Sequence, residues 1–406
     1  MSFLRKPLLM LTYDDALARI LARIGPLAPE DTPLTDALGR VLAEEVTTPF
    51  PLPPFANSSM DGFAVRAGDI GALPTTLPVA GDIAAGATTV PTLLPGQALR
   101  IMTGAPVPPG ADAVVPVEDP EAREGGTAFL EAVTEGQCIR PAGEEAAAGS
   151  VVLRAGTILR PAHIGLAATV GRATLRTYPR PRVAVLSTGD ELIEPGQALG
   201  FGQIYNSNAY ALAALVADAG GVVTHRLHAR DTPEALRQAF DTAEDADVLI
   251  TSGGVSVGDY DYVKSVFAER GTVDFWKVAI RPGKPVAFGR WGGTHFFGLP
   301  GNPSSTIVTF ELFVRPALRR LAGHTELTRP AVTATLTEPA SHTPGRQSYQ
   351  RAVVTRAAEG QAEVRALTKQ GSGMLLPMTE ANALLVLPAD TERLPTGASV
   401  TVLLLD

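Results

Sequence analysis

The sequence predicts a multidomain protein of mixed α/β and β class: a central α/β domain with a parallel sheet, an inserted β domain, a helical N-terminal domain and a small C-terminal β-barrel. Three observations support this fold class. Strand and helix patterns alternate over residues 182–322, which is typical of a parallel sheet covered on both faces. Residues 62–155 and 330–406 show short apolar runs divided by Gly and Pro, which indicate β structure. A length of 406 residues suits two to four domains.

The beginning of the chain is predicted to be helical. Thr12, with Asp15 three residues later, is a helix-start signal, and apolar residues then recur at helical spacing as far as Gly25. A second short helix is predicted over residues 34–42. The segment "TTPFPLPPFANSSMDGFAV" that follows is too rich in proline for a regular helix.

The β-rich stretch lies between two helical segments, because "PAHIGLAATVG" after it again predicts a short helix. We therefore expect residues 1–49 and 147–178 to form one helical linker domain. Residues 50–146 would then be a β domain inserted into it.

Residues 179–328 are predicted to form the α/β domain, and residues 329–406 a barrel of about five strands. In the α/β domain, strands are expected at residues 182–189, 222–229, 246–254, 274–280, 285–291 and 295–301. Helices are expected at residues 208–221, 232–245, 260–271 and 303–323. Pro316 is expected to kink the last of these helices.

Composition and charge exclude several classes of protein. The net charge of −8 argues against a surface that coats nucleic acid, and no uncharged stretch is long enough to cross a bilayer. The N-terminal segment is unlike a secretion signal, because Pro7 interrupts its short apolar run and Asp14 and Asp15 end it. Cys138 is the sole cysteine, so an internal disulfide and a Cys-rich zinc site are excluded. We expect a cytoplasmic protein with neither nucleic-acid nor membrane partners.

The segment "TSGGVSVGDYDYVK" (residues 251–264) is a glycine-rich loop between a predicted strand and a predicted helix. Gly253, Gly254 and Gly258 allow sharp turns that bring main-chain N–H groups close to a phosphate. The loop carries neither the dinucleotide fingerprint nor the P-loop signature. The alternative is a plain turn in which Asp259 or Asp261 caps the next helix.

Acidic residues follow three successive strands of the predicted sheet. Asp190 and Glu191 follow the first, Asp231 the second and Asp261 the third. The carboxyl ends of parallel strands share one edge, so these side chains would converge there. Converging carboxylates repel one another unless a cation joins them, and hard oxygen donors suit Mg²⁺. For Asp231, capping of the next helix is an equally open interpretation.

Basic and capping residues are predicted at the same end of the sheet. Lys277, Arg281 and Lys284 surround a Pro-Gly turn, and Asn302 with Pro303 predicts a helix start whose free N–H groups attract anions. A solvated charged loop and an ordinary capped helix are the alternatives. Taken together, these loops suit a phosphate-bearing substrate and a second anion.

Seven motifs, in order, resemble those of molybdopterin molybdenumtransferases, the molybdenum insertases related to the carboxy-terminal part of gephyrin. The motifs are "SSMDGFAV", "RIMTGAPVPPGADAVVPVE", "IRPAGEE", "STGDEL", "SGGVSVGDYDYVK", "RPGKPVAFG" and "GLPGNPSS". The resemblance extends from near residue 12 to near the end, and implies an α/β domain of the molybdopterin-binding type. It also implies the reaction: molybdate enters adenylylated molybdopterin, the pyrophosphate link is cleaved with Mg²⁺ or a similar ion, and molybdenum cofactor and AMP leave.

The resemblance also implies roles for individual residues. Asp261, Asp231 and Glu191 would bind the cation or position water. Molybdate would contact Arg281, Lys284, Ser305, Arg351 and Ser372. The adenylylated pterin would contact Asp61, Thr103, Arg140, Asp190, Ser252, Gly253, Gly254, Val255, Ser256, Gly258, Lys277, Pro300, Gly301, Asn302, Pro303 and Ser304. A homodimer is implied, in which the β insertion of one subunit closes over the α/β domain of the other. The resemblance also leads us to expect a molybdopterin adenylyltransferase as a partner protein.

Three positions depart from the family pattern. Arg281 stands where many relatives carry Lys, Glu145 where Asp is usual, and Pro377 where a small polar residue is common. Two other functions are compatible with parts of the chain. A molybdopterin adenylyltransferase would resemble residues 182–322 alone, and a non-catalytic, gephyrin-like scaffold would need an added domain that is not seen here.

Overall fold

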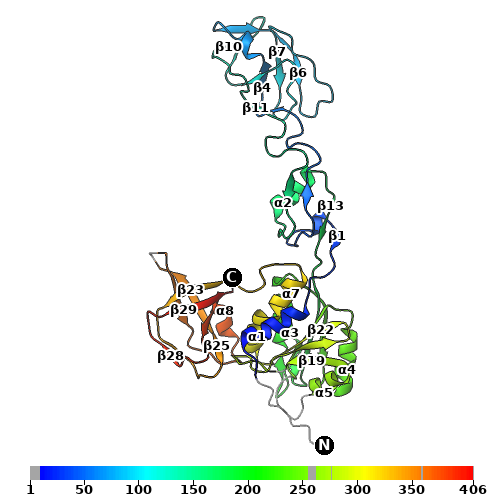
Figure 1. The fold of residues 1–406 in the computed structure, drawn as a ribbon, viewed down its shortest axis with the longest axis vertical. Helices are drawn as coiled ribbons and strands as arrows, with labels where there is room; N and C mark the ends of the chain where they lie inside the picture. Colours follow the sequence, from blue (N-terminus) through cyan, green and yellow to red (C-terminus); the bar gives the residue numbers. More distant parts are fainter. Residues whose placement is uncertain (1–9, 255–261, 276, 358–359, 406) are drawn as a thin grey trace, which may run out of the picture. The chain divides into compact units, whose positions relative to one another are not determined.

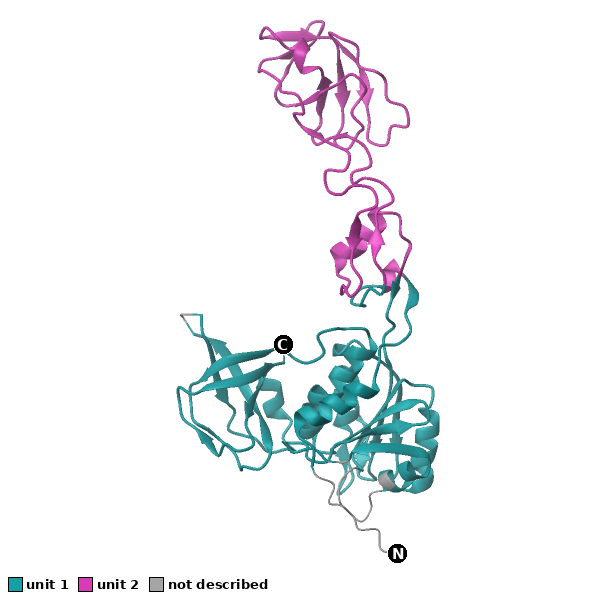
Figure 2. Cartoon of the chain, viewed as in Figure 1, with its two compact units in different colours: residues 1–32, 37–43, 176–406 teal, residues 33–36, 44–175 magenta. Residues whose placement is uncertain are grey.

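The computed structural model describes residues 10–254, 262–275, 277–357 and 360–405. The chain forms two compact units (Figure 2). Unit 1 comprises residues 1–32, 37–43 and 176–406, and unit 2 comprises residues 33–36 and 44–175.

The centre of unit 1 is a six-stranded sheet (Figure 1). The strands lie in the order β17 (Val222–Ala229), β14 (Arg182–Thr188), β18 (Val248–Ser252), β22 (Thr294–Leu299), β21 (Ala287–Trp291) and β19 (Gly271–Phe275). The first four strands are parallel, as expected, but β21 runs in the opposite direction and pairs antiparallel with both β22 and β19. The reason is the connection: only Gly292 and Gly293 separate β21 from β22, and so short a loop can join only antiparallel strands.

Helices cover both faces of this sheet (Figure 1). One face is covered by α1 (Tyr13–Arg23), α3 (Ser207–Asp218), α6 (Pro303–Thr309) and α7 (Arg315–Leu321). The other face is covered by α4 (Pro233–Thr242) and α5 (Tyr262–Arg270). Among the described residues, no helix has the length and apolar character needed to span a membrane.

The first helix begins where the sequence predicts, since the Thr12 hydroxyl accepts a hydrogen bond from the Asp15 main-chain N at 3.1 Å. Its buried residues Ala16 and Ile20 belong to the core that contains Val183 of β14. Helix α1 therefore packs within the α/β unit, whereas the sequence analysis grouped it with residues 147–178. Amphipathic spacing predicts that a helix has a buried face but not which partner covers that face.

The last helix of the sheet domain is interrupted by a π-helical turn, η3 (Phe310–Val314), between α6 and α7. A kink was predicted at Pro316. The irregular turn begins earlier, at Phe310, and Pro316 lies in the first turn of α7, where its missing N–H is tolerated. Glu311 on this turn is buried.

Five strands close the C-terminal barrel: β23 (Ala331–Leu336), β25 (Gln347–Arg356), β26 (Ala362–Ala366), β27 (Ala383–Leu387) and β29 (Ser399–Leu404). Closure comes from the pairing of β25 with β27. Strand β20 (Ile280–Arg281) pairs with β25 in parallel, with Arg281 opposite Ser348. The Pro-Gly turn after Arg281 is thereby attached to the barrel. Shorter elements here are β24 (Ala340–Ser341), α8 (Leu376–Glu380) and β28 (Arg393–Leu394).

Unit 2 is mainly β structure, as predicted. A four-stranded sheet contains β6 (Val79–Ile83), β7 (Ala98–Ile101), β4 (Gly62–Val65) and β8 (Ala113–Pro116). A three-stranded sheet contains β5 (Thr75–Leu77), β10 (Gly126–Phe129) and β9 (Glu121–Arg123). Two strand pairs follow, β11 (Ile139–Arg140) with β3 (Asn57–Ser58) and β12 (Val151–Leu153) with β2 (Val46–Thr47). The helix predicted from "PAHIGLAATVG" is α2 (Pro161–Thr169).

The prediction of a helix over residues 34–42 is wrong. Only one 3₁₀ turn, Leu34–Asp36, forms there. Gly39 adopts a left-handed conformation with φ of +78°, which no α-helix accommodates, and so short a segment gains few hydrogen bonds for the cost of helix nucleation.

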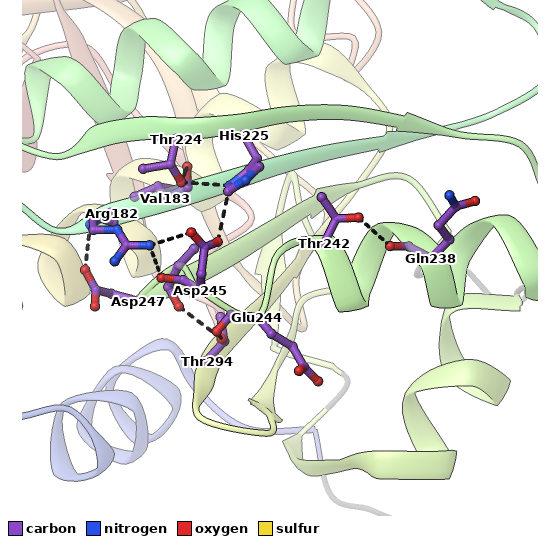
Figure 3. A network of polar contacts seen from close by, with 11 residues as sticks. Arg182, Val183, Thr224, His225, Gln238, Thr242, Glu244, Asp245, Asp247 and Thr294 are labelled. Atoms are coloured by element: carbon purple, nitrogen blue, oxygen red, sulfur yellow. Dashed lines mark hydrogen bonds and ion pairs between the residues drawn. The ribbon is translucent and has the colours of Figure 1, made fainter.

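A network of polar contacts secures the amino-terminal edge of the sheet (Figure 3). The Arg182 main-chain N donates to the Asp247 carboxylate at 2.7 Å, and the Arg182 guanidinium donates to the Asp245 carboxylate at 2.7 Å. The Thr294 hydroxyl donates to the Ala246 carbonyl at 3.0 Å. These contacts tie the starts of β14 and β22 to the loop before β18, and leave the carboxyl edge for a ligand.

Candidate functional site

A cavity of about 370 Å³ lies at the carboxyl edge of the parallel strands. We call it the strand-end cavity; its walls are the ends of β14 and β18, the pair β15 (Leu192–Ile193) with β16 (Ile204–Tyr205), the start of α3 and residues 301–303. Five predicted site residues line it: Glu191, Ser252, Gly301, Asn302 and Pro303.

Glycines at the end of β18 are required by close packing. Gly253 has φ of +96°, and a Cβ there would lie 2.9 Å from Thr188 Oγ1. Gly254 has φ of +65°, and a Cβ there would lie 2.4 Å from Val263 Cγ2. The Gly253 N–H donates to the Leu299 carbonyl at 3.1 Å, which joins the ends of β18 and β22. The loop therefore starts from a turn that larger residues would not fit.

The rest of that loop lies outside the described residues. Val255, Ser256, Gly258 and Asp261 are among the positions concerned. The helix after the loop, α5, is described from Tyr262.

The acids at the neighbouring strand ends share one electrostatic environment. Burial raises the pKa of Asp231, and the charges of Asp190 and Glu191 raise it further, while His228 opposes the shift. The Glu191 carboxylate lies over Gly189, since a Cβ on that glycine would be 2.6 Å from Glu191 Oε2. This proximity is what strand-end spacing predicts for these three acids.

Helix capping does not account for Asp231. Thr232 is the N-cap of α4, and its hydroxyl accepts a hydrogen bond from the Ala235 main-chain N at 3.3 Å. Nε2 of His228, four residues before Thr232, lies 2.9 Å from the Gly189 carbonyl oxygen. The interpretation of Asp231 as the N-cap of the next helix is therefore wrong.

The described residues do not by themselves form a metal site. Within residues 10–254, 262–275, 277–357 and 360–405, no group of three or more His, Cys, Asp or Glu side chains could hold a metal ion. A divalent cation at this edge would need a further ligand, such as Asp261 or a phosphate of the substrate.

A second cavity, of about 1180 Å³, lies between the Pro-Gly turn, the start of α6 and the barrel. We call it the barrel-edge cavity. Arg281, Lys284, Ser305 and Ser372, four of the five residues predicted for molybdate, line it, and so does Pro300. These are the side chains that suit a tetrahedral oxyanion.

The Pro-Gly turn is held on two sides. Arg281 Nη1 donates to Thr343 Oγ1 of the barrel at 3.1 Å. A Cβ on Gly283, which has φ of +102°, would lie 2.2 Å from Thr309 Cγ2 of α6. Lys277 is exposed and lines neither cavity.

Arg351, the fifth predicted molybdate residue, lies behind the cavity wall. It is 2% exposed, and its guanidinium donates to the carbonyls of Lys369 at 2.8 Å and Gly371 at 3.2 Å. Burial lowers its pKa. Arg351 thus shapes the loop that carries Ser372 and is not among the cavity-lining residues.

Asn302 precedes the helix, as predicted, but its side chain does not cap it. Asn302 Nδ2 instead donates to Ser372 Oγ at 3.1 Å, and the Ser304 main-chain N donates to the Ser372 carbonyl at 3.0 Å. One N–H expected to serve an anion is therefore used to hold the barrel loop. Asn302 lines both cavities, which consequently adjoin.

Three predicted substrate residues belong to unit 2. Asp61 Oδ1 accepts hydrogen bonds from the Thr103 main-chain N at 2.6 Å and from Thr103 Oγ1 at 2.7 Å, and these bonds lower the pKa of Asp61. The fold thus brings Asp61 and Thr103 together. Arg140 is exposed on β11, and Glu145 is also exposed.

Sequence reasoning missed several polar residues of the strand-end cavity. Thr188, Asn208 and the buried Ser187 line it. Ser187 and Thr188 belong to the motif "STGDEL", in which only the acids were selected. Asn208 ends the polar run "NSN" (residues 206–208) and was predicted only as the start of the helix over residues 208–221. The two adjoining cavities offer hydroxyl and amide donors with acids in one, and cations in the other.

Comparisons with known proteins agree with this architecture. Residues 11–171 match the family model "MoeA N-terminal region (domain I and II)", residues 184–320 match "Probable molybdopterin binding domain", and residues 333–405 match "MoeA C-terminal region (domain IV)". The chain is 44% identical to molybdopterin molybdenumtransferase 2 of Mycobacterium tuberculosis, over 92% of this chain and 94% of that protein. It is 38% identical to the molybdopterin molybdenumtransferase of Haemophilus influenzae, over 97% and 98%.

A solved structure agrees as well. The molybdopterin biosynthesis MoeA protein of Pyrococcus horikoshii is 31% identical, with a TM-score of 0.81 over 98% of this chain and 99% of that one. The matches cover all parts of the fold described above and nearly the full length of both partners. The chain belongs to the molybdopterin molybdenumtransferase family.

Proposed function

We propose that the protein transfers molybdate into adenylylated molybdopterin, with cleavage of the pyrophosphate link, and releases molybdenum cofactor and AMP. The observation that carries this proposal is the junction of two cavities of different chemistry at Asn302. A substrate with a phosphate-bearing end and a metal-accepting end needs both compartments side by side. The names of the relatives support the transfer of molybdenum to molybdopterin.

In this proposal the strand-end cavity binds the adenylate and pyrophosphate. Gly254, with Val255, Ser256 and Gly258, supplies main-chain donors to the phosphates, and Ser252 supplies a hydroxyl. Gly253 contributes the turn that brings the loop to the substrate, because its own N–H is bonded to Leu299. Asp190, Gly301, Pro303 and Ser304 complete the contacts. A low-dielectric, donor-lined cavity holds the pyrophosphate oxygens where charge develops on cleavage.

We propose Glu191, Asp231 and Asp261 as the ligands of a divalent cation such as Mg²⁺. The shared electrostatic environment of Asp231, Asp190 and Glu191 supports this assignment, because a cation would relieve their mutual repulsion. When bound, the cation would offset negative charge on the pyrophosphate.

The barrel-edge cavity binds molybdate in this proposal. Arg281 and Lys284 supply charge, and Ser305 and Ser372 supply hydroxyl donors. Arg351 keeps the Ser372 loop in place through its bonds to Lys369 and Gly371. Lys277 and Pro300 remain proposed substrate contacts near these residues.

We further propose a cytoplasmic homodimer in which Asp61, Thr103 and Arg140 of one subunit face the glycine-rich loop of the other. The four-part division, residues 1–49 with 147–178, 50–146, 179–328 and 329–406, is proposed as its domain plan, except that helix α1 packs on the α/β domain. A molybdopterin adenylyltransferase would deliver the substrate.

The test is a single-turnover assay of AMP release from adenylylated molybdopterin with the purified protein. We expect release to require both molybdate and a divalent cation, and Asp261→Asn to retain substrate binding while slowing release by about 10²–10⁴-fold. If the protein instead makes adenylylated molybdopterin from ATP and molybdopterin, it is an adenylyltransferase. If it binds these ligands without any turnover, the scaffold interpretation holds.

A further inference from the structure

A single amide side chain joins the ends of two neighbouring strands. Asn208 lies in the first turn of α3 and lines the strand-end cavity. Its Nδ2 donates to Ser252 Oγ, at the end of β18, at 2.9 Å and to the Gly301 carbonyl, just after β22, at 2.7 Å. A carbonyl oxygen only accepts, so the amide nitrogen must face it, which fixes the orientation of the Asn208 side chain.

This arrangement determines what Ser252 can do. Because Ser252 Oγ accepts from Asn208, the hydroxyl hydrogen is left to donate elsewhere. Ser252 is 3% exposed and lines the strand-end cavity, so a ligand there can accept that hydrogen.

A second hydroxyl lies beside it. Ser187 of β14 is opposite Ser252 of β18 in the sheet and also lines the strand-end cavity. It is 0% exposed, and its Oγ has no hydrogen-bond partner within the part of the chain that the structure describes. A buried hydroxyl without a partner costs free energy, which a ligand with acceptor oxygens would recover.

The Gly301 carbonyl presents the opposite problem. An unpaired carbonyl oxygen at the wall of an anion site would repel the ligand, since its dipole points its negative end outward. The Asn208 amide satisfies this oxygen and so removes the repulsion. One side chain thus creates a donor and masks an acceptor at the same wall.

We propose that Asn208 is a positioning residue that makes the strand-end cavity selective for phosphate. It orients the Ser252 hydroxyl as a donor to a phosphate oxygen and shields the Gly301 carbonyl. The ligand class is a nucleoside monophosphate group, free or as part of the substrate. The inference deepens the proposed function, on which it rests for the identity of that substrate.

The experiment is a double-mutant cycle with AMP as the probe. Calorimetry would measure the AMP affinity of the wild type, Asn208→Ala, Ser252→Ala and the double variant. We expect each single change to weaken binding by about 10- to 100-fold, and the double variant to be no weaker than the weaker single one. Losses that multiply in the double variant, or an Asn208→Ala affinity equal to wild type, would overturn the inference.

An isosteric change guards against simple misfolding. Asn208→Asp keeps the shape but, when ionised, has no hydrogen to donate to Ser252 or Gly301. AMP affinity should be lost at neutral pH and partly recovered when the carboxyl is protonated at acidic pH, relative to wild type at the same pH. A pH-independent loss would indicate a merely structural role and refute the proposal.

The matched control is Asn382→Ala. Asn382 also makes two hydrogen bonds through its amide, accepting from the Val354 main-chain N and donating to the Val354 carbonyl in the barrel, and it lines neither cavity. Its removal should leave AMP affinity unchanged. If wild type does not bind AMP, the inference fails; if the coupling is found but AMP is never released from adenylylated molybdopterin, the proposed function fails while the inference stands.

Discussion

At the scale of single residues, the site depends on positions where main chain or side chains approach closely. Gly253 and Gly283 mark the two cavities, and each would place a Cβ within 3 Å of another residue. The sequence analysis proposed both turns from Gly and Pro alone. Asn208 was not predicted, because the polar run "NSN" (residues 206–208) also suits a helix start, and its importance arises from two strand ends that only the fold brings together.

Gly283→Ala should destabilise the protein and weaken molybdate binding. The added methyl group would overlap Thr309 Cγ2 and force a left-handed residue to carry a Cβ, at a cost of about 1–3 kcal/mol. Urea unfolding and molybdate calorimetry would measure the two effects. Gly293→Ala is the control, since it meets nothing within 4 Å and should be near neutral. Equal behaviour of both variants would refute the packing argument.

Asp231→Asn should stabilise the protein in the absence of divalent cations while slowing AMP release. The change removes one of the acids that repel one another near Asp190 and Glu191. Thermal melts at neutral pH would show a higher melting temperature for the variant. Added Mg²⁺ should raise the melting temperature of the wild type but not of the variant. The exposed Asp390→Asn should change neither, and a Mg²⁺ response retained by Asp231→Asn would remove this residue from the cation site.

His295 should make stability fall as the pH is lowered from about 6.5 to about 4. Burial and the charge of Arg290 lower its pKa from 6.5 to about 4. In that range the unfolded chain binds a proton that the folded chain does not, so unfolding is favoured as pH falls. His295→Phe keeps a ring beside Phe288 but cannot titrate. Urea unfolding should show the variant gaining stability relative to wild type at pH 4.5 compared with pH 7.5; a constant difference would contradict the assignment.

At the scale of elements, the sequence predicted what local periodicity determines. The order of strands and helices in the α/β domain, the β insertion and a barrel of about five strands are confirmed. The partners of elements were harder to predict, because they depend on contacts distant in sequence. Helix α1 packs on the α/β sheet, β21 runs opposite to its two neighbours in that sheet, and β20 joins the barrel. The acids at the strand ends were predictable because parallel topology alone brings them to one edge.

Glu311 of the π-turn forms the two most buried ion pairs of those described here, with Arg315 and Arg329, and Glu311→Gln should be strongly destabilising. Glu311 is paired with Arg329 through contacts of 2.8 and 3.1 Å, and its side chain is 4% exposed. Loss of its charge leaves Arg329 and Arg315 with Asp218 as their remaining acidic partner, at a cost of about 3–5 kcal/mol.

Urea unfolding would measure this cost, and the surface offers a matched control. Glu269 pairs with Arg237 through two contacts of 2.7 Å, yet its side chain is 42% exposed. Glu269→Gln should cost less than about 1 kcal/mol. Comparable losses in the two variants would mean that burial does not set the strength of these pairs.

At the scale of the whole molecule, the chain passes between its two units at four points, near residues 32, 36, 43 and 175. The acids assigned to the proposed site therefore fall in different units: Asp61 in unit 2, Asp231 in unit 1. If the active form is a dimer whose sites combine unit 2 of one subunit with unit 1 of the other, two inactive variants should complement each other.

Mixed subunits of Asp61→Asn and Asp231→Asn should recover about a quarter of wild-type AMP release. Random pairing makes half of the dimers mixed, and each mixed dimer has one site with both acids intact. Co-expression with two affinity tags would isolate the mixed dimer, whose activity should be about half that of wild type. Inactive mixed dimers would place Asp61 and Asp231 of the same chain in one site. Active monomers in sedimentation would rule out the shared site altogether.

The pairing of β20 with β25 makes the barrel inseparable from the chemistry of the turn beside it. Ile280 and Arg281 are continuous with the α/β domain in sequence, yet by hydrogen bonding they are a sixth strand of the barrel sheet. A chimera that exchanged the barrel at residue 329 would replace the strand that holds Arg281 as well as the loop that carries Ser372. The barrel therefore cannot be exchanged in evolution as an independent module. A new barrel must contain a strand that pairs with β20, or the Pro-Gly turn after Arg281 loses its support.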